Sequence, residues 1–429
     1  MSSHAFNKRR RSGQNGLKMR RTTAYFQPHY ANNESLILKD TKAVVCCVWI
    51  DRNGYTPSAG DTKLMAMSEQ DVNDHKGPLS GFRVLDLSSV VSGPMAAVVL
   101  ADQGADVIKI EPPGWGDGIR GLGASRNGLS AIYAMINRNK RSVAINLKVT
   151  AGRDLVLSLV NDADVVLQNY RPGKMARLGL DYESLRVINP NLIYASINGM
   201  GEFGPLADQK VYDYVIQGVS GLLDSHQAGS GTGDLQMVRT IIYDKVTALT
   251  AAQGITSALL ARERGAGGQH VQLSMLDAAL YFNWPDLMWN YSFKGQGISF
   301  SPDLADMCEV SETKNGAIIS SYLGADTSGY DTDQLLQLLA DNEIPVGRVN
   351  RRSEVLHDPQ VQASGSVLEL EHPRGGALLQ PRSAVRFDGT PTPPPKPSAE
   401  LGEHTVEVLA ELGLSLEEMQ ALAHQGAIG

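Results

Sequence analysis

Acidic residues, short glycine-rich stretches and scattered cysteines and histidines are the parts of this sequence with a capacity for chemistry. Asp244 lies in TIIYDK, just ahead of a long segment rich in Ala, Leu and Thr, so it falls at the start of a predicted helix. A carboxylate there can act as a covalent nucleophile. It can equally cap free backbone N–H groups and complement the helix dipole, which is the commoner use of such a residue. The residue types alone leave both interpretations open.

The other motifs lack the spacing that their chemistry requires. Gly93 follows the first predicted strand, and Glu111 lies at a plausible distance for a ribose-binding acid, but no GxGxxG is present. A dinucleotide site is therefore disfavoured. The sequence has no Walker loop, HExxH or GxSxG, and the glycines of Gly199–Gly204 follow a strand without opening a helix. The three cysteines and nine histidines show no metal-ligand spacing, so we predict no metal site and a reducing compartment.

Length and charge set the class of protein. A chain of 429 residues is long enough for two domains or one large discontinuous domain. With 42% hydrophobic and 20% charged residues, the composition is that of an ordinary globular protein. The formal net charge is -7, but seven Lys and Arg residues precede the first acid, Glu34, which leaves -14 for the remainder. Because these residues carry so large a negative charge, we expect them to repel the phosphates of nucleic acid. No apolar run reaches the roughly 20 residues of a membrane span.

Residues 1–76 show no sustained periodicity, and we predict a flexible N-terminal extension. The first residues are free of acids and carry Arg and Ser, which is compatible with an organelle transit peptide, and KRRR is compatible with a nuclear signal. Short basic tracts of this kind often arise by chance. A cytoplasmic protein is therefore the first expectation, with a mitochondrial location as the alternative if this segment is a transit peptide.

From Gly77 onward, predicted strands and helices alternate. The strands are expected at residues 82–87, 106–111, 163–167, 192–197 and 271–275, and the helices at 95–103, 152–162, 182–189, 243–264, 276–289 and 404–412. This alternation predicts an α/β fold with a parallel sheet covered by helices on both faces. The more polar residues 286–369 predict a small, separate α+β domain. A capping-box pattern at Ser415 predicts one last short helix.

Six ordered blocks of the sequence carry a family resemblance. They are GPLSG, VLDLSSVVSGP, LADQGADVIKIEPPGWGD, NRNKRSVAINLK, ADVVLQNYRPGKMARLGLDYESL and NPNLIYASINGMGEFGP. Together they resemble the class III CoA-transferases, the family of carnitine and formyl-CoA transferases and α-methylacyl-CoA racemase. The resemblance covers nearly all of residues 77–429. It implies a Rossmann-like large domain, discontinuous in sequence, formed by 77–285 with 370–429. It also implies a small domain at 286–369, shortened relative to the family, and an interlocked homodimer.

The resemblance implies a chemical role for Asp244. Its place between Tyr212-Asp213 and the long helix matches the family's covalent nucleophile. Attack on an acyl-CoA gives a mixed anhydride, and the released thiolate then forms an aspartyl-CoA thioester that an acceptor carboxylate can open. The expected partners are thus an acyl-CoA and a carboxylic acid. CoA is expected as a substrate, with no permanently bound cofactor.

The resemblance also implies a set of CoA contacts, because the phosphates of CoA need cations and backbone donors. The candidates are Val91, Ser92, Gly93, Lys109, Arg120, Lys140, Asn169, Tyr170, Arg171, Met175, Lys210 and Tyr212. In the racemases a histidine stands where this chain has Tyr212. Tyrosine, with an ordinary pKa of about 10, is a poor base near neutral pH, so transfer is favoured over racemisation.

Two alternatives remain open at this point. One is a racemase or another enzyme acting on the α-carbon of an acyl-CoA. The other is a catalytically inactive CoA-binding homologue, because a shortened small domain would leave a reactive anhydride less protected from water.

Overall fold

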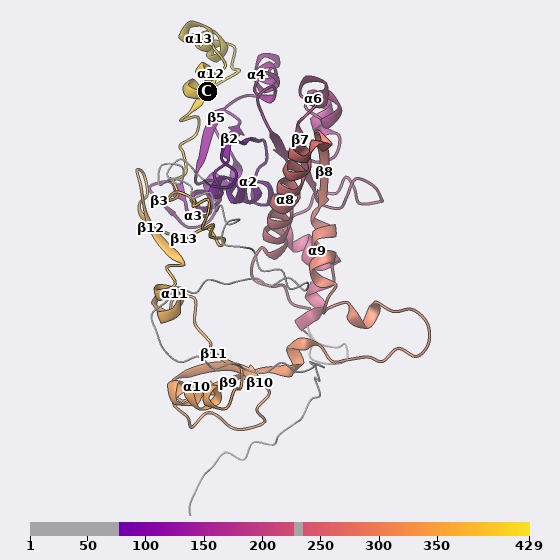
Figure 1. Cartoon of the computed structure of the whole chain (residues 1–429), viewed down its shortest axis with the longest axis vertical. Coiled ribbons are helices and arrows are strands. Elements are labelled where there is room, and N and C mark those ends of the chain that lie inside the picture. Colours follow the sequence, from indigo (N-terminus) through magenta and orange to yellow (C-terminus); the bar gives the residue numbers. More distant parts are fainter. Residues whose placement is uncertain (1–76, 227–234) are drawn as a thin grey trace, which may run out of the picture. The chain divides into compact units, whose positions relative to one another are not determined.

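The computed structural model describes residues 77–226 and 235–429, and it divides into two units (Figure 1). One unit contains residues 309–347, and the other contains 77–308 and 348–429. Each unit is described by itself. The predicted extension over residues 1–76 lies outside the described residues, and the domain boundaries at 285 and 370 stay predictions.

The larger unit is built on a six-stranded parallel sheet with the strand order β5-β2-β1-β6-β7-β8. Its strands are β1 (Arg83–Asp86), β2 (Asp106–Glu111), β5 (Lys140–Ala144), β6 (Val165–Gln168), β7 (Ile193–Asn198) and β8 (Gln269–Ser274). The chain runs outward from β1 through β2 to β5, and then returns to the other side of β1 for the remaining strands. This is the order of a Rossmann-type doubly wound sheet, so the predicted α/β fold is confirmed.

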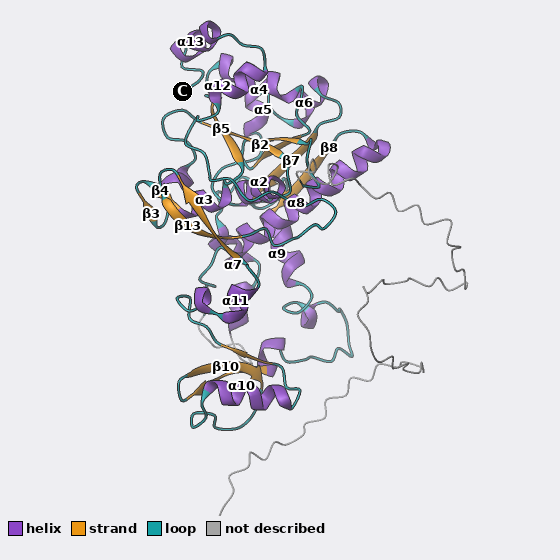
Figure 2. Ribbon diagram, turned by 60° about the vertical axis from the view of Figure 1, so that its left-hand side comes forward, coloured by secondary structure: helices purple, strands orange, loops and turns teal. Residues whose placement is uncertain are grey.

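Helices cover both faces of the sheet (Figure 2). One core contains side chains of α2 (Ser92–Asp102), α7 (Asp213–Val219), α8 (Ile242–Ala261) and α9 (Met275–Asn283). The other contains side chains of α4 (Thr150–Val160), α5 (Lys174–Leu178), α6 (Tyr182–Ile188), α12 (Thr405–Glu411) and α13 (Leu416–His424). Successive strand residues supply opposite cores, as Val84 and Leu85 do in β1, because side chains alternate along a strand. The predicted capping box at Ser415 is present.

Shorter elements complete the larger unit. They are β3 (Ser125–Arg126), β4 (Leu129–Ser130), α3 (Ala131–Ile136), α11 (Pro359–Ala363), β12 (Val367–His372) and β13 (Gly376–Pro381). The strands of each pair, β3 with β4 and β12 with β13, are antiparallel. None of the helices in the described ranges is long and apolar enough to cross a bilayer.

One strand of the large sheet was not predicted, and two predicted helices end earlier in the structure. Strand β5 lies where we expected only CoA contacts, because its first residues, Lys140 and Arg141, hide the apolar signal of a strand. The helix predicted to end at residue 264 ends at Ala261 and turns at Gly265, whose φ of 94° favours glycine. The helix predicted to reach residue 289 ends at Asn283.

The smaller unit contains a three-stranded sheet in the order β11-β10-β9 and one long helix. The strands are β9 (Cys308–Thr313), β10 (Gly316–Ser321) and β11 (Val346–Arg348), and the helix is α10 (Thr332–Asp341). Its core consists of Ile318, Leu335 and Leu339, all fully buried. Three large side chains form a small core, consistent with the modest length of this unit.

Candidate active site

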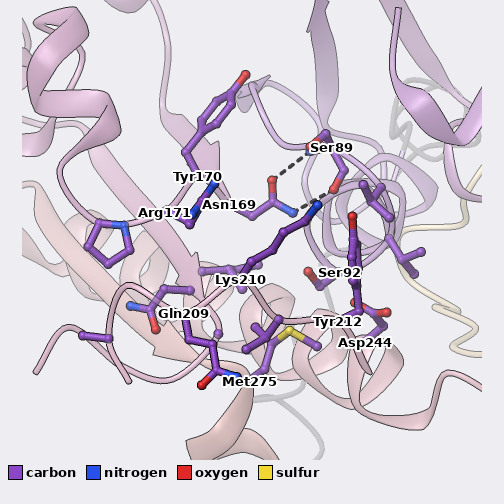
Figure 3. Close-up of a pocket in the computed structure, with 18 residues that line it drawn as sticks. Ser89, Ser92, Asn169, Tyr170, Arg171, Gln209, Lys210, Tyr212, Asp244 and Met275 are labelled. Carbon is purple, nitrogen blue, oxygen red and sulfur yellow. Dashed lines mark hydrogen bonds between the residues drawn. The ribbon is translucent and has the colours of Figure 1, made fainter. Parts of the chain in front are cut away.

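The sheet brings two loops together where its strand order reverses. β1 and β6 are neighbours, but the chain leaves them toward opposite edges, and ligands of such sheets bind beyond the carboxyl ends of strands at this position. The backbone N–H of Ser89, after β1, donates to Oδ1 of Asn169, after β6, over 2.8 Å. Nδ2 of Asn169 returns a hydrogen bond of 2.7 Å to the carbonyl of Ser89 (Figure 3). These two hydrogen bonds join the two loops that bound the candidate site.

Asp244 lies in the first turn of α8 and lines two cavities. The smaller, of about 150 Å³, is bounded by the loops after β1 and β6 and by Lys210 and Tyr212 (Figure 3). The larger, of about 970 Å³, has mainly apolar walls. Its apolar lining residues are Val90, Val91, Leu122, Ile132, Met237, Val238 and Ile241. The Asp244 carboxylate is therefore accessible from both sides.

The helix cap at α8 is supplied by Asp213, not by Asp244. Oδ2 of Asp213 accepts the backbone N–H groups of Tyr243, over 2.6 Å, and Asp244, over 3.2 Å. Its Oδ1 accepts a 2.5 Å bond from Nε2 of Gln217, and the residue is 3% exposed. Because Asp213 satisfies these donors, the Asp244 carboxylate makes no capping hydrogen bond, although it lies in the first turn of the helix.

The environment of Asp244 changes its acidity. Burial, together with the negative charge of Asp213, raises the pKa of Asp244 from 3.8 to about 7, and the backbone N–H of Ser92 acts in the opposite direction as a hydrogen-bond donor. A carboxylate that is desolvated and held beside another carboxylate is a typical feature of a reactive site. Asp244 therefore titrates near neutral pH.

Eight of the residues predicted from the sequence line the smaller cavity. They are Val91, Ser92, Asn169, Tyr170, Arg171, Lys210, Tyr212 and Asp244. Five others, Gly93, Lys109, Arg120, Lys140 and Met175, do not line it. Gly93 lies just behind the loop, where a Cβ atom would come within 2.2 Å of Cβ of Ser88, so its role here is to let two segments approach closely. Met175 is 4% exposed and belongs to the core.

The three cations outside the cavity are paired with carboxylates. Nζ of Lys140 lies 2.9 Å from Asp86, and Nζ of Lys109 lies 3.1 Å from Asp117, with all four side chains at most 2% exposed. Arg120 pairs with Glu111 over 2.7 Å. These charges point into the protein, because neighbouring carboxylates neutralise them there. For these three residues a contact with CoA stays a prediction.

Glu111 is also the residue that a dinucleotide site would use to bind ribose. It is 1% exposed. Although burial alone raises the pKa of Glu111, the hydrogen bond from Arg120 and the charges of Lys109 and Arg120 lower it to about 2. Its acceptor oxygens are occupied by Arg120, Ser142 and the backbone of Asp117. The buried carboxylate is thus part of the scaffold behind the loop after β1.

Comparison with known proteins decides the family. The family model described as CoA-transferase family III matches residues 79–319 and 301–405. The chain belongs to CoA-transferase family III.

Individual relatives of family III extend over most of the chain. It is 35% identical over 395 residues to the succinate–glutarate CoA-transferase of Agrobacterium fabrum, covering 80% of this chain and 97% of that protein. It is 30% identical over 387 residues to the succinyl-CoA:glutarate CoA-transferase of Homo sapiens, covering 80% and 88%. The crystal structure of a CAIB/BAIF family protein from Brucella suis has a TM-score of 0.69 and 29% identity, covering 79% and 100%. The predicted enzyme class, a family III CoA-transferase, is confirmed.

A cluster of cations beside the family III site was missed by the sequence analysis. Lys174 has three cationic neighbours, Arg171, Lys148 and Arg177, and its burial and then their charges lower the pKa of Lys174. Nζ of Lys174 lies 4.1 Å from the centroid of the Tyr170 ring. The spacing of Arg171, Lys174 and Arg177, three residues apart, was the available signal for one positively charged face.

Tyr212 lies at the border of both cavities. Its ring is stacked with Tyr214 at 6.2 Å, and Nζ of Lys210 lies 5.3 Å from the ring centroid. A stacked aromatic ring beside an ammonium group is suited to contacting a ligand chain. Lys210 and Tyr212 thus form one wall of the smaller cavity.

Proposed function

We propose that this protein transfers CoA from an acyl-CoA to a free carboxylic acid through a covalent intermediate on Asp244. The observation that carries the proposal is the Asp244 carboxylate itself, because Asp213 relieves it of capping and two cavities meet at it. With two cavities at one carboxylate, a thioester can reach the nucleophile from one side and an acid from the other.

The proposed steps conserve atoms and charge. The Asp244 carboxylate attacks the thioester carbonyl and expels CoA thiolate, which leaves a mixed anhydride. The thiolate attacks the aspartyl carbonyl of this anhydride, releases the donor acid and forms an aspartyl-CoA thioester. The acceptor carboxylate then repeats the two steps in reverse, so that the new acyl-CoA leaves and the Asp244 carboxylate is restored. No external energy source is needed, because a thioester is exchanged for a thioester.

We place the phosphates of CoA at the four-cation cluster formed by Lys148, Arg171, Lys174 and Arg177. Arg171 also lines the smaller cavity, so the cluster lies at the end of a path that leads to Asp244. Four mutually repelling cations are stabilised when an anion binds among them. The 3′-phosphate and the diphosphate of CoA supply this anion.

Neutralising part of this cluster is expected to weaken CoA binding. The double variant Lys174→Gln/Arg177→Gln loses two charge-assisted contacts, which raises KM for the acyl-CoA about 10–100-fold. The value of kcat changes less, because neither side chain reaches Asp244. Steady-state kinetics with varied acyl-CoA test this. The matched control is Arg186→Gln on α6, where Arg186 pairs with Glu183 at the surface. An unchanged KM in the double variant would contradict the placement.

We propose a short dicarboxylic acid as the acceptor. Arg239 lines the larger cavity together with Asp244, and it forms no ion pair with any residue that the structure describes. The walls between them are largely apolar, which suits a methylene chain with a carboxylate at each end. The two curated relatives described above are named as acting on glutarate, a dicarboxylate of this kind.

Removing the Arg239 charge is expected to separate dicarboxylates from monocarboxylates. Arg239→Gln raises KM for glutarate about 10–50-fold, through loss of one charge-assisted hydrogen-bonded pair. The KM for butyrate or valerate, which lack the second carboxylate, stays within about 2-fold. Acceptor kinetics at saturating acyl-CoA measure both values. Equal effects on both acceptors would show that Arg239 does not bind the distal carboxylate.

We also propose that the protein is a homodimer with interlocked chains, as its resemblance to the family implies. Support comes from large aromatic side chains on and after α9 that are exposed in the single chain. These are Tyr281, Phe282, Trp284, Tyr291, Phe293 and Phe300. Aromatic side chains are enriched at subunit interfaces, and six exposed ones in one segment favour such a contact. Light scattering after gel filtration is expected to give twice the 46.2 kDa chain mass, and a monomer at micromolar concentration would contradict the proposal.

A further inference from the structure

The loop between β1 and α2 contains a strained residue. Val90 has a φ of 69°, in the left-handed region that β-branched residues rarely adopt. Such a conformation costs free energy and persists only where the surrounding structure enforces it. Val90 directly precedes Val91 and Ser92, and all three line the smaller cavity with Asp244. The strain is therefore located next to the candidate nucleophile.

Asp117 holds Val90 in this conformation. The backbone N–H of Val90 donates to Oδ1 of Asp117 over 3.0 Å and to Oδ2 over 3.1 Å. The side chain of Asp117 is 2% exposed, and its Oδ1 also accepts the N–H of Ile119. Asp117 in turn is positioned by its own N–H, which donates to Glu111 over 2.9 Å. Because this buried carboxylate accepts several hydrogen bonds at once, it holds the loop in one conformation.

Buried charges behind the loop hold its first residues as well. Nζ of Lys109 lies 3.1 Å from Asp117 and donates to the carbonyl of Ser88 over 3.0 Å. Asp86 accepts the N–H of Ser88 over 3.0 Å and its hydroxyl. Replacing a buried ion pair by apolar residues often costs no stability, so such groups are retained for the conformation that they specify. Here that conformation is the loop.

The front of the loop faces Asp244. Val91 and Ser92 line the smaller cavity together with Asp244, and the N–H of Val91 has no hydrogen-bond partner among the described residues. Amide groups held rigidly beside a reacting carbonyl stabilise the negative oxygen that develops during acyl transfer. A relaxed Val90 would turn these two amides away, because a change in φ at residue 90 rotates everything that follows it.

We propose that Asp117 is a positioning residue for the reaction, which clamps Val90 in its left-handed conformation and thereby fixes the amide groups of Val91 and Ser92 against Asp244. The proposal rests on the function proposed above. It assigns a purpose to the buried Lys109, which then serves the site through Asp117 and Ser88. The role is distinct from that of Asp213, which holds the helix that carries Asp244.

A rescue experiment tests the clamp. Asp117→Asn is expected to lower kcat about 30–100-fold with KM for the acyl-CoA changed less than about 3-fold, through partial loss of the amide donors. In the Val90→Gly background, the same substitution is expected to lower kcat less than about 3-fold, because glycine adopts a positive φ without a clamp. In Asp117→Asn alone, the pH profile is also expected to move upward, since Ser92 no longer lowers the pKa of Asp244. An equal loss of kcat in both backgrounds would overturn the proposal.

A stability comparison covers the case in which Asp117→Asn does not fold. Val90→Gly and Val90→Ala both remove the two γ-methyl groups, and the glycine variant, which also lacks Cβ, is normally the less stable of the two. At a left-handed position the order is reversed, so Val90→Gly is expected to have the higher melting temperature. The Val90→Gly/Asp117→Asn chain is then expected to fold, and its failure to do so, or a higher melting temperature for Val90→Ala, would overturn the clamp. This comparison needs no enzyme activity, so it stays separable from a wild-type protein that transfers no CoA.

Discussion

Asp244→Asn is expected to abolish CoA transfer and, at the same time, to make the folded protein more stable at neutral pH. An amide cannot form the anhydride or the aspartyl thioester, so the rate falls at least about 10⁴-fold. The gain in stability has a separate cause. Asp244 is a carboxylate whose ionisation the folded state opposes, and asparagine has no charge to bury.

The sign of the stability effect follows from the two pKa values. Below pH 3.8 Asp244 is protonated in both the folded and the unfolded chain, and the substitution changes little. Between pH 4 and pH 7 the unfolded chain loses the proton and the folded chain keeps it, so the wild-type protein loses stability as the pH rises. The interval from 3.8 to about 7 corresponds to about 4 kcal/mol as an upper limit. The gain in Asp244→Asn is thus fully present above pH 7 and disappears toward pH 4.

Denaturant unfolding at pH 8 and pH 4.5, beside an isotope-exchange assay with labelled acyl-CoA, measures both effects. Asp154→Asn on α4 is a matched control, because Asp154 is an exposed helix aspartate far from the site in sequence. It is expected to leave activity and stability unchanged. Retained exchange in Asp244→Asn would refute the covalent mechanism. So would a wild-type enzyme that exchanges the α-hydrogen of an acyl-CoA and leaves its CoA in place.

Asp213→Asn is expected to have the second largest effect, on both stability and the pH profile. Asp213 accepts hydrogen bonds from two backbone N–H groups and from Gln217 while almost fully buried. Asparagine offers one acceptor oxygen and places an NH2 group against these donors, which is expected to cost about 2–4 kcal/mol in the free energy of unfolding. Because the charge of Asp213 contributes to the raised pKa of Asp244, its removal also lowers that pKa below about 7.

The pH dependence of kcat/KM is the readout that a purely structural role would not move. In the wild type, kcat/KM is expected to rise as Asp244 loses its proton near pH 7. In Asp213→Asn the rise is expected at lower pH, with a reduced plateau. A stability loss with an unchanged midpoint would mean that Asp213 holds α8 without influencing the nucleophile electrostatically.

Much of the fold was predictable from periodicity, because strands such as Asp106–Glu111 are short apolar runs bounded by breakers. The positions of the charged side chains were not. Lys109 and Lys140 look like surface cations in the sequence, yet both are buried, Lys109 in the interior strand β2 and Lys140 in the edge strand β5. The register of β1 with β2 places Asp86 beside Lys109, and the segment after β2 brings Asp117 to the same ammonium group. In the sequence alone, a lysine that forms an inward ion pair looks the same as a lysine that contacts a phosphate at the surface.

The function of Asp244 was equally hidden from local sequence. At the start of a helix an aspartate is by default a cap, and the residue that takes over this duty, Asp213, lies 31 residues earlier in another helix. The resemblance to a family identified the nucleophile, whereas the physical reason for its freedom required the structure. The cations Lys174 and Arg177 show the reverse case, since their three-residue spacing was visible in the sequence.

The C-terminal residues of the chain form hydrogen bonds with β5, the strand at one edge of the large sheet. The N–H of His404 donates to the carbonyl of Ser142, the N–H of Asn146 to Ala427, and the N–H of Gly429 to Ala144. During synthesis on the ribosome, the outer backbone groups at β5 therefore lack their hydrogen-bond partners, and the apolar face beside β5 stays uncovered, until the final residues have emerged. Because such long-range contacts form late, the nascent enzyme depends on being shielded from aggregation for nearly its whole translation. Loss of even the last two dozen residues is expected to leave an insoluble chain, although every residue around Asp244 would be intact.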